Sequence, residues 1–210
     1  MRLRITFSKS GPLRYSGHLD LHTIWERTVR RAGLPLAYTQ GFHPGPRLQL
    51  ASALPLGIIG RAEIVDIWIN DNTQPLEGRF KEVLQSAAPP GLVIVSIVEV
   101  DDRAPALQTM VVAAEYEITL LDPVARQTLE AKISSLLEAA SLPRERRGKP
   151  YDLRPLIESL SLLPEDAGGP PRLHMRLASR QGATGRPEEV LDALGIAGGI
   201  TRIERTCLVI

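Results

Sequence analysis

The sequence predicts an α+β protein built from two ferredoxin-like βαββαβ halves with antiparallel sheets. The length of 210 residues suits two domains of roughly 100 residues each. Alternating apolar residues predict strands, and apolar residues spaced three and four apart predict helices. The predicted elements run strand, helix, strand, strand, helix, strand, and this order occurs twice. We therefore expect halves at residues 1–104 and 105–210, joined near Asp101–Gln108. A single larger α+β domain is the alternative.

The elements of the N-terminal half follow from periodicity and turn residues. RLRITF (2–7) alternates polar and apolar residues, which predicts a strand. Apolar residues at helical spacing predict a helix that starts at Ser16 or His18 and ends at Ala32, where Gly33 suits the C-cap. The remaining predicted elements are short strands at Leu36–Thr39 and around Leu48–Ala53, a strand at 62–69, a helix at 75–87 and a strand at 92–100.

The C-terminal half shows the same alternation of periods. Its predicted elements are a strand at 110–121, a helix at 123–140, a hairpin of 153–163 with 172–179 across the linker 164–171, a helix at 187–194 and a strand at 200–210. The stretch RERRGKPYDLR (144–154) carries a local charge of +3, and we interpret it as a solvated connection. A second loop facing phosphate groups is the alternative.

Composition excludes several classes of protein. A single cysteine, Cys207, excludes a disulfide framework, a multi-cysteine zinc site and an iron–sulfur cluster held by this chain alone. The opening MRLRITFSKSG lacks the apolar region of a signal peptide, and no stretch approaches the ~18 apolar residues of a membrane span. We expect a cytoplasmic protein with no membrane contact. Phosphate-loop, dinucleotide and G-x-S-x-G motifs are absent.

The near-zero net charge of +1 hides an asymmetry. Residues 1–61 hold nine basic residues against two acids, and five of the nine aromatic residues. Proteins that bind single-stranded nucleic acids typically use basic side chains to contact the phosphates and aromatic rings to stack on the bases. A solvated basic face with the aromatic residues in the core is the alternative. The predicted nucleic-acid-binding residues are Lys9, Arg14, Tyr15, Arg27, Arg30, Arg31, Tyr38, Gln40, Phe42, His43 and Arg47.

Three polar residues form H-x-D-x-H at the start of the first helix. We predict His18 and Asp20 as the catalytic pair if the chain is an enzyme, because a neutral imidazole can take a proton from a ribose hydroxyl. Helical spacing also allows His18 and His22 to share a metal, but we predict no metal site and no cofactor. We expect His18 to precede the first helical turn and to face Arg14 and the loop 38–47.

Several stretches resemble one family. They are F-S-K-S-G-P-L-R-Y-S-G-H-L-D-L (7–21), E-R-T-V-R-R-A-G-L-P-L-A-Y-T-Q-G-F-H-P (26–44) and L-P-L-G (54–57), with looser matches at 148–154, 185–191 and 202–206. Together they are similar to the radical SAM-linked proteins, a bacterial domain of unknown function that stands beside a radical SAM enzyme or is fused to it. The family's form has serine and asparagine where this chain has Gly17 and His43. The matching positions include His18 and Asp20.

The resemblance implies a radical SAM enzyme as partner, with the iron–sulfur cluster on that partner. Members of the family are often encoded near genes for ribonucleases and ribosomal proteins, which favours RNA as the ligand. We therefore expect an RNA-binding accessory protein that presents substrate and is not an enzyme on its own. Two alternatives remain open. One is a metal-independent endoribonuclease or RNA-modifying enzyme that uses His18; the other is a protein–protein adaptor that binds no nucleic acid.

Overall fold

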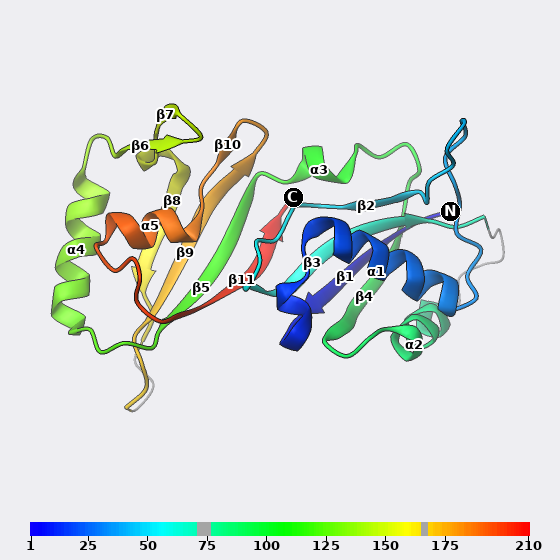
Figure 1. Ribbon diagram of the computed structural model, residues 1–210, viewed down its shortest axis with the longest axis horizontal. Helices are drawn as coiled ribbons and strands as arrows, with labels where there is room; N and C mark the ends of the chain where they lie inside the picture. Colours follow the sequence, from blue (N-terminus) through cyan, green and yellow to red (C-terminus); the bar gives the residue numbers. More distant parts are fainter. Residues whose placement is uncertain (71–76, 165–167) are drawn as a thin grey trace. The chain divides into compact units, whose positions relative to one another are not determined.

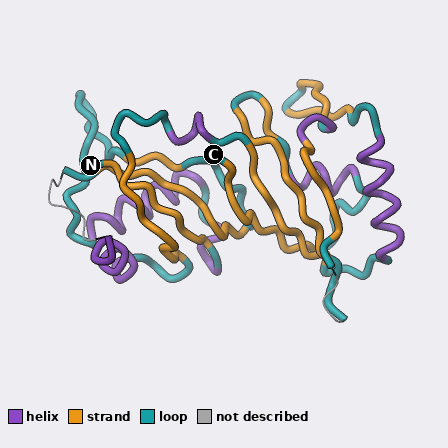
Figure 2. The backbone as a smooth tube through the Cα atoms, turned by 180° about the vertical axis from the view of Figure 1, so that it is seen from behind, coloured by secondary structure: helices purple, strands orange, loops and turns teal. Residues whose placement is uncertain are grey.

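The structure is a computed structural model that describes residues 1–70, 77–164 and 168–210. The chain divides into two compact units, Met1–Val111 and Val112–Ile210. Figures 1 and 2 show that each unit consists of an antiparallel sheet with accompanying helices. The two units are described separately below. The α+β class with two ferredoxin-like halves is confirmed.

Unit 1 contains one βαββαβ set. Its elements are β1 (Arg2–Lys9), the 3-10 helix η1 (Gly11–Tyr15), α1 (His18–Arg31), β2 (Leu48–Leu50), β3 (Ile59–Trp68), α2 (Glu77–Ala87), β4 (Leu92–Val100) and the short α3 (Leu107–Met110). The strands lie in the order β4–β1–β3–β2, and every neighbouring pair is antiparallel. Each β–helix–β crossover therefore skips one strand, as the ferredoxin-like topology requires.

The core of unit 1 lies between the sheet and the helices α1 and α2. Alternate residues of β1, namely Leu3, Ile5 and Phe7, are buried, as the alternation predicted. Phe7 meets Trp25 of α1 edge to face, with ring centroids 5.0 Å apart. The helix ends as predicted, because Gly33 adopts a φ of +69°, a conformation that costs glycine little. This packing fixes the orientation of α1, so its polar face carries its arginines outward.

Unit 2 repeats the same topology with one insertion. Its elements are β5 (Ala113–Leu120), α4 (Arg126–Glu138), β6 (Pro143–Arg146), β7 (Lys149–Asp152), the 3-10 helix η2 (Arg154–Leu156), β8 (Ile157–Leu162), β9 (Arg172–Arg180), β10 (Ala183–Thr184), α5 (Pro187–Ala193) and β11 (Thr201–Val209). The main sheet runs β11–β5–β9–β8, and β10 pairs with the end of β9. The hairpin β6–β7 forms a separate two-stranded sheet.

Two predicted segments differ from the structure, and parts of two others cannot be compared with it. Leu36–Thr39 forms no strand and makes only the isolated bridges Leu36–Ile69 and Tyr38–Pro46. The stretch 144–154, predicted as a solvated connection without strands, holds most of the solvent-facing hairpin β6–β7. Residues 75–76 of the predicted second helix, and 165–167 of the predicted linker, lie outside the described residues. Within the described parts of the chain, no helix combines the length and apolar character that a bilayer span requires.

Candidate functional site

The end of α1 and the following loop carry most of the predicted binding residues. We call these residues the α1–loop surface; they are Arg27, Arg30, Arg31, Tyr38, Gln40, Phe42 and His43, and all of them are exposed. The arginines lie on the last turns of α1, where cations also interact favourably with the helix dipole. The loop 38–46 protrudes from unit 1 beyond that end of the helix (Figure 1).

The loop is pinned at its base. Thr39 N–H donates to the carbonyl of Gly45 at 2.8 Å, and Gly45 N–H donates to Thr39 Oγ1 at 3.0 Å. Arg47 N–H donates to Ala37 O at 2.8 Å, which closes the base from the other side. The tip beyond these bonds holds Phe42, whose side chain is 102 % exposed. A ring held in water on an anchored loop is available to stack on a ligand ring.

One contact joins the helix to the loop. The Arg30 guanidinium donates from Nε and Nη2 to the Tyr38 hydroxyl at 3.0 and 2.5 Å and lies over the Tyr38 ring at 5.7 Å. The hydrogen bond to Tyr38 raises the pKa of Arg30, which therefore stays charged. Glu26 pairs with Arg30 at 2.8 Å, whereas none of the described residues forms an ion pair with Arg27 or Arg31. The surface thus keeps net positive charge beside aromatic rings.

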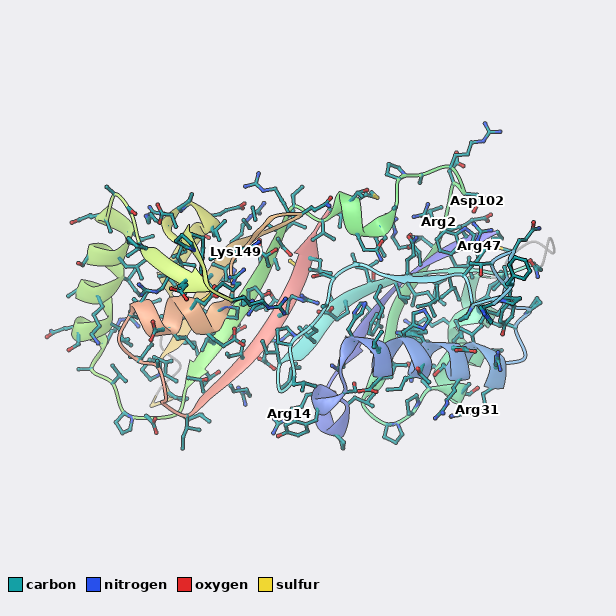
Figure 3. All side chains as sticks on the ribbon, turned by 45° about the horizontal axis from the view of Figure 1, so that its top comes forward. Arg2, Arg14, Arg31, Arg47, Asp102 and Lys149 are labelled. Atoms are coloured by element: carbon teal, nitrogen blue, oxygen red, sulfur yellow. The ribbon has the colours of Figure 1, made fainter. Side chains whose placement is uncertain are left out.

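Arg47 lies away from the helix arginines. Its guanidinium covers the Trp68 ring at 4.8 Å and pairs with Asp102 at 3.5 Å. Arg2 lies over the same ring at 4.9 Å. Figure 3 shows Arg47 beside Asp102 and Arg2, apart from Arg31 at the end of α1. Arg47 therefore borders the site and is largely occupied by contacts within unit 1.

Part of the basic charge counted along the sequence is not at the surface. Lys9 is wholly buried, and its Nζ donates to the Ser16 carbonyl at 2.7 Å. The α1–loop surface therefore excludes Lys9, which ties the end of β1 to the junction between η1 and α1. Arg2 and Arg4 both bind the buried carboxylate of Asp66, at 2.6 and 2.9 Å. No sequence signal shows this pairing, because the partners are more than 60 residues apart.

The predicted catalytic pair lies at the other end of α1. His18 is the first residue of the helix and Gly17 is its N-cap, so the expectation that His18 precedes the first turn is wrong. Asp20 turns back to accept the Gly17 N–H at 2.9 Å, which occupies its carboxylate with capping. Arg14 and Tyr15 precede this end of the helix and contact one another.

The two ends of α1 cannot form one groove. Fourteen residues at 1.5 Å per residue separate them by about 20 Å. Figure 3 shows Arg14 and Arg31 at opposite ends of the helix. The expected convergence of His18 with the loop 38–47 is therefore wrong.

The pKa of His18 is lowered in the folded protein. Partial burial, and then repulsion by His22, lower its pKa from the usual value of 6.5. The imidazole is neutral at pH 7, as a general base requires. Within residues 1–70, 77–164 and 168–210, however, no group of three or more His, Cys, Asp or Glu side chains could hold a metal ion.

Comparison with known proteins gives the fold and the family. A chain in the crystal structure of a Cbf5–Nop10–Gar1 complex aligns with a TM-score of 0.54 and 9 % identity, covering 98 % of this chain and 48 % of that one. Chains of the archaeal box H/ACA sRNP Nop10–Cbf5 complex (TM-score 0.49, 11 % identity, coverage 99 % and 48 %) and of an H/ACA RNP bound to a substrate RNA containing 2′-deoxyuridine (0.48, 10 %, 98 % and 47 %) align less closely. This chain thus spans about half the length of those chains.

At such low identity these likenesses show the fold alone. No curated protein matches the sequence. The family described as "Uncharacterized protein conserved in bacteria (DUF2344)" matches residues 2–187, and the chain belongs to that family.

Proposed function

We propose that this protein binds single-stranded RNA through the α1–loop surface and presents it to a radical SAM enzyme. The observation that carries the proposal is Phe42, fully exposed at the tip of a loop whose base is pinned. A phenylalanine in water gains nothing for folding, because it buries no apolar area. The same ring gains about 1–3 kcal/mol when a base stacks on it.

The neighbouring charges suit the phosphates of such a strand. Arg27, Arg30 and Arg31 are exposed on the last turns of α1, and Tyr38 offers a second ring in contact with Arg30. Stacking rings beside cations are how proteins hold single strands with little sequence preference. The predicted catalytic pair, His18 and Asp20, lies at the far end of α1 from this surface. A presenting role therefore fits it better than cleavage.

The proposed partner follows from the family resemblance and the cysteine content. A single cysteine cannot ligate an iron–sulfur cluster, so the radical chemistry would belong to a second protein. The structural similarity to a chain of the Cbf5 complex supports the fold and carries no information about ligands of this protein. The partner is tested by copurification from cells and by stimulation of that enzyme's turnover.

The RNA proposal is tested by Phe42→Ala in the full chain. We expect the dissociation constant for a fluorescein-labelled uridine 10-mer to rise about 5- to 150-fold, the equivalent of 1–3 kcal/mol. The melting temperature should not change, because the ring is fully exposed. Leu121→Ala, which removes another exposed apolar side chain, in unit 2, is the matched control and should leave binding unchanged.

Fluorescence anisotropy measures the affinity, and a denaturing gel run after incubation with excess chelator measures the RNA length. Unchanged affinity in the Phe42 variant would overturn the assigned surface. Shortened RNA that depends on His18 would instead favour the endoribonuclease alternative. Absence of RNA binding by the wild-type chain would favour the adaptor alternative.

A further inference from the structure

The hairpin β6–β7 in unit 2 has an unusual turn. Its strands pair in register from Pro143–Asp152 to Arg146–Lys149, which leaves a two-residue turn of Arg147 and Gly148. Both residues have positive φ, 53° and 74°, the pattern of a type I′ turn. Asparagine or glycine suits the first position, and arginine there is strained. Arg147 is the one non-glycine residue with positive φ in the described part of the chain.

Polar contacts hold the hairpin, which has no buried side chain. None of the side chains of β6 or β7 is buried. Arg146 holds one side of the ribbon: it donates to both carboxylate oxygens of Glu189 in α5 at 3.0 and 2.5 Å and to the Thr184 carbonyl at 3.0 Å. Its guanidinium also stacks on Tyr151 at 4.7 Å. An isolated two-stranded hairpin is only marginally stable in water, so these contacts supply its order.

The base of the ribbon is held in the same way. Asp152 Oδ1 accepts the backbone N–H groups of Leu142 and Arg154 at 2.7 and 2.9 Å. These two bonds lower the pKa of Asp152. Arg154 in turn donates to the Leu137 carbonyl of α4 at 2.9 Å. Polar contacts therefore tie the hairpin and the residues that follow it to both α4 and α5.

The tip that these contacts hold in place is cationic. Arg147 and Lys149, the latter labelled in Figure 3, are exposed. Neither forms an ion pair with any residue in 1–70, 77–164 or 168–210, whereas Arg144 and Arg146 lower in the hairpin pair with Asp192 and Glu189. The chain thus keeps a strained arginine at a position where asparagine would fold better. A strained residue held by surrounding structure is a signature of a functional site.

We propose that this tip, Arg147 with Lys149, is a second contact for the phosphate backbone of the RNA. The proposal rests on the proposed function, since the ligand is the same class of single-stranded RNA. The tip has two cations and no aromatic side chain to stack on a base, so it would contact phosphates. This contact is therefore independent of the RNA sequence.

The test is the double variant Arg147→Asn with Lys149→Gln in the full chain. Asn-Gly is the preferred type I′ pair, so the variant should melt at the wild-type temperature or above it. Loss of two phosphate contacts should lower the log–log salt slope for a labelled uridine 40-mer by about 1.4 and weaken binding about tenfold at 0.15 M salt. Arg103→Gln with Arg180→Gln removes two other exposed charges and is the matched control.

The outcomes separate this proposal from the proposed function. If the hairpin variant binds the 40-mer as the wild type does, while Phe42→Ala weakens both RNAs, the second contact is refuted and the α1–loop surface stands. If the hairpin variant weakens the 40-mer and Phe42→Ala does not, the hairpin contacts RNA and the α1–loop assignment is refuted. A 40-mer affinity that falls equally in the Arg103 and Arg180 control would show general charge attraction and refute a localised contact. Binding to an acidic peptide but not to the 40-mer would identify a protein surface and refute it as well.

Discussion

Replacing Asp66 by asparagine should destabilise unit 1 strongly. The Asp66 carboxylate is 0 % exposed and receives two guanidinium groups, those of Arg2 (2 % exposed) and Arg4 (12 % exposed). Arg2 donates to Oδ2 from Nε and Nη2 at 2.9 and 2.6 Å, and Arg4 donates to Oδ1 and Oδ2 at 2.9 and 3.0 Å. An amide keeps one acceptor oxygen but removes the charge, which leaves two poorly solvated cations facing one another.

The size of the effect follows from these burials. Removing one partner of a buried ion pair costs about 3–5 kcal/mol. Arg2 keeps the carbonyls of Ala104 and Pro105 at 2.7 and 2.9 Å, and Arg4 reaches some solvent, so the lower end, about 3 kcal/mol, is expected. With a urea m value of about 2 kcal/mol/M, the midpoint should fall by about 1.5 M.

Tryptophan fluorescence reports this unfolding directly. The chain has two tryptophans, and both Trp25 and Trp68 lie in unit 1. Glu26→Gln is the control, because it breaks the partly exposed i,i+4 pair with Arg30 and should cost less than about 0.5 kcal/mol. A midpoint for Asp66→Asn within about 0.3 M of the wild-type value would refute the reasoning that this carboxylate neutralises a buried cluster.

Three further changes test other parts of the structure. Gly91→Ala should destabilise unit 1 by more than about 2 kcal/mol in urea, because Gly91 has a φ of +90° and a Cβ there would overlap the Ser10 carbonyl; wild-type stability would contradict that geometry. Gln85→Leu should promote self-association in light scattering, since the Gln85 amide accepts from Ile94 N–H at 2.7 Å and covers the edge of β4; a monodisperse variant would argue against this protection. Asp152→Asn should reduce the amount by which folding stability falls at low pH. Because its pKa is lowered in the folded state, the Asp152 carboxylate stabilises the fold above the ordinary carboxyl pKa of about 4. That contribution is lost as the pH falls through the lowered pKa. Equal urea midpoint shifts between pH 6 and 3 in wild type and variant would refute it.

Local patterns in the sequence determined most of the secondary structure. The alternation of Leu3, Ile5 and Phe7 identified β1, and the spacing of Leu21, Trp25 and Val29 identified the buried face of α1. These patterns are readable because burial on one face imposes the period of the element itself. The repeated element order then identified the fold class, since few topologies accommodate two βαββαβ sets.

Tertiary structure decided which charged residues reach solvent. Lys9 looks like any basic residue in the sequence, yet packing places its Nζ beside the Ser16 carbonyl in the interior. The sequence did not predict the hairpin β6–β7, because none of its side chains is buried. Its strands therefore show no alternation of apolar and polar residues. His18 and the loop 38–46 are neighbours in the sequence, but the rigid length of α1 holds them apart. Periodicity shows which face of an element is buried, whereas the partner of a charge depends on contacts between distant residues, and only the folded chain makes those.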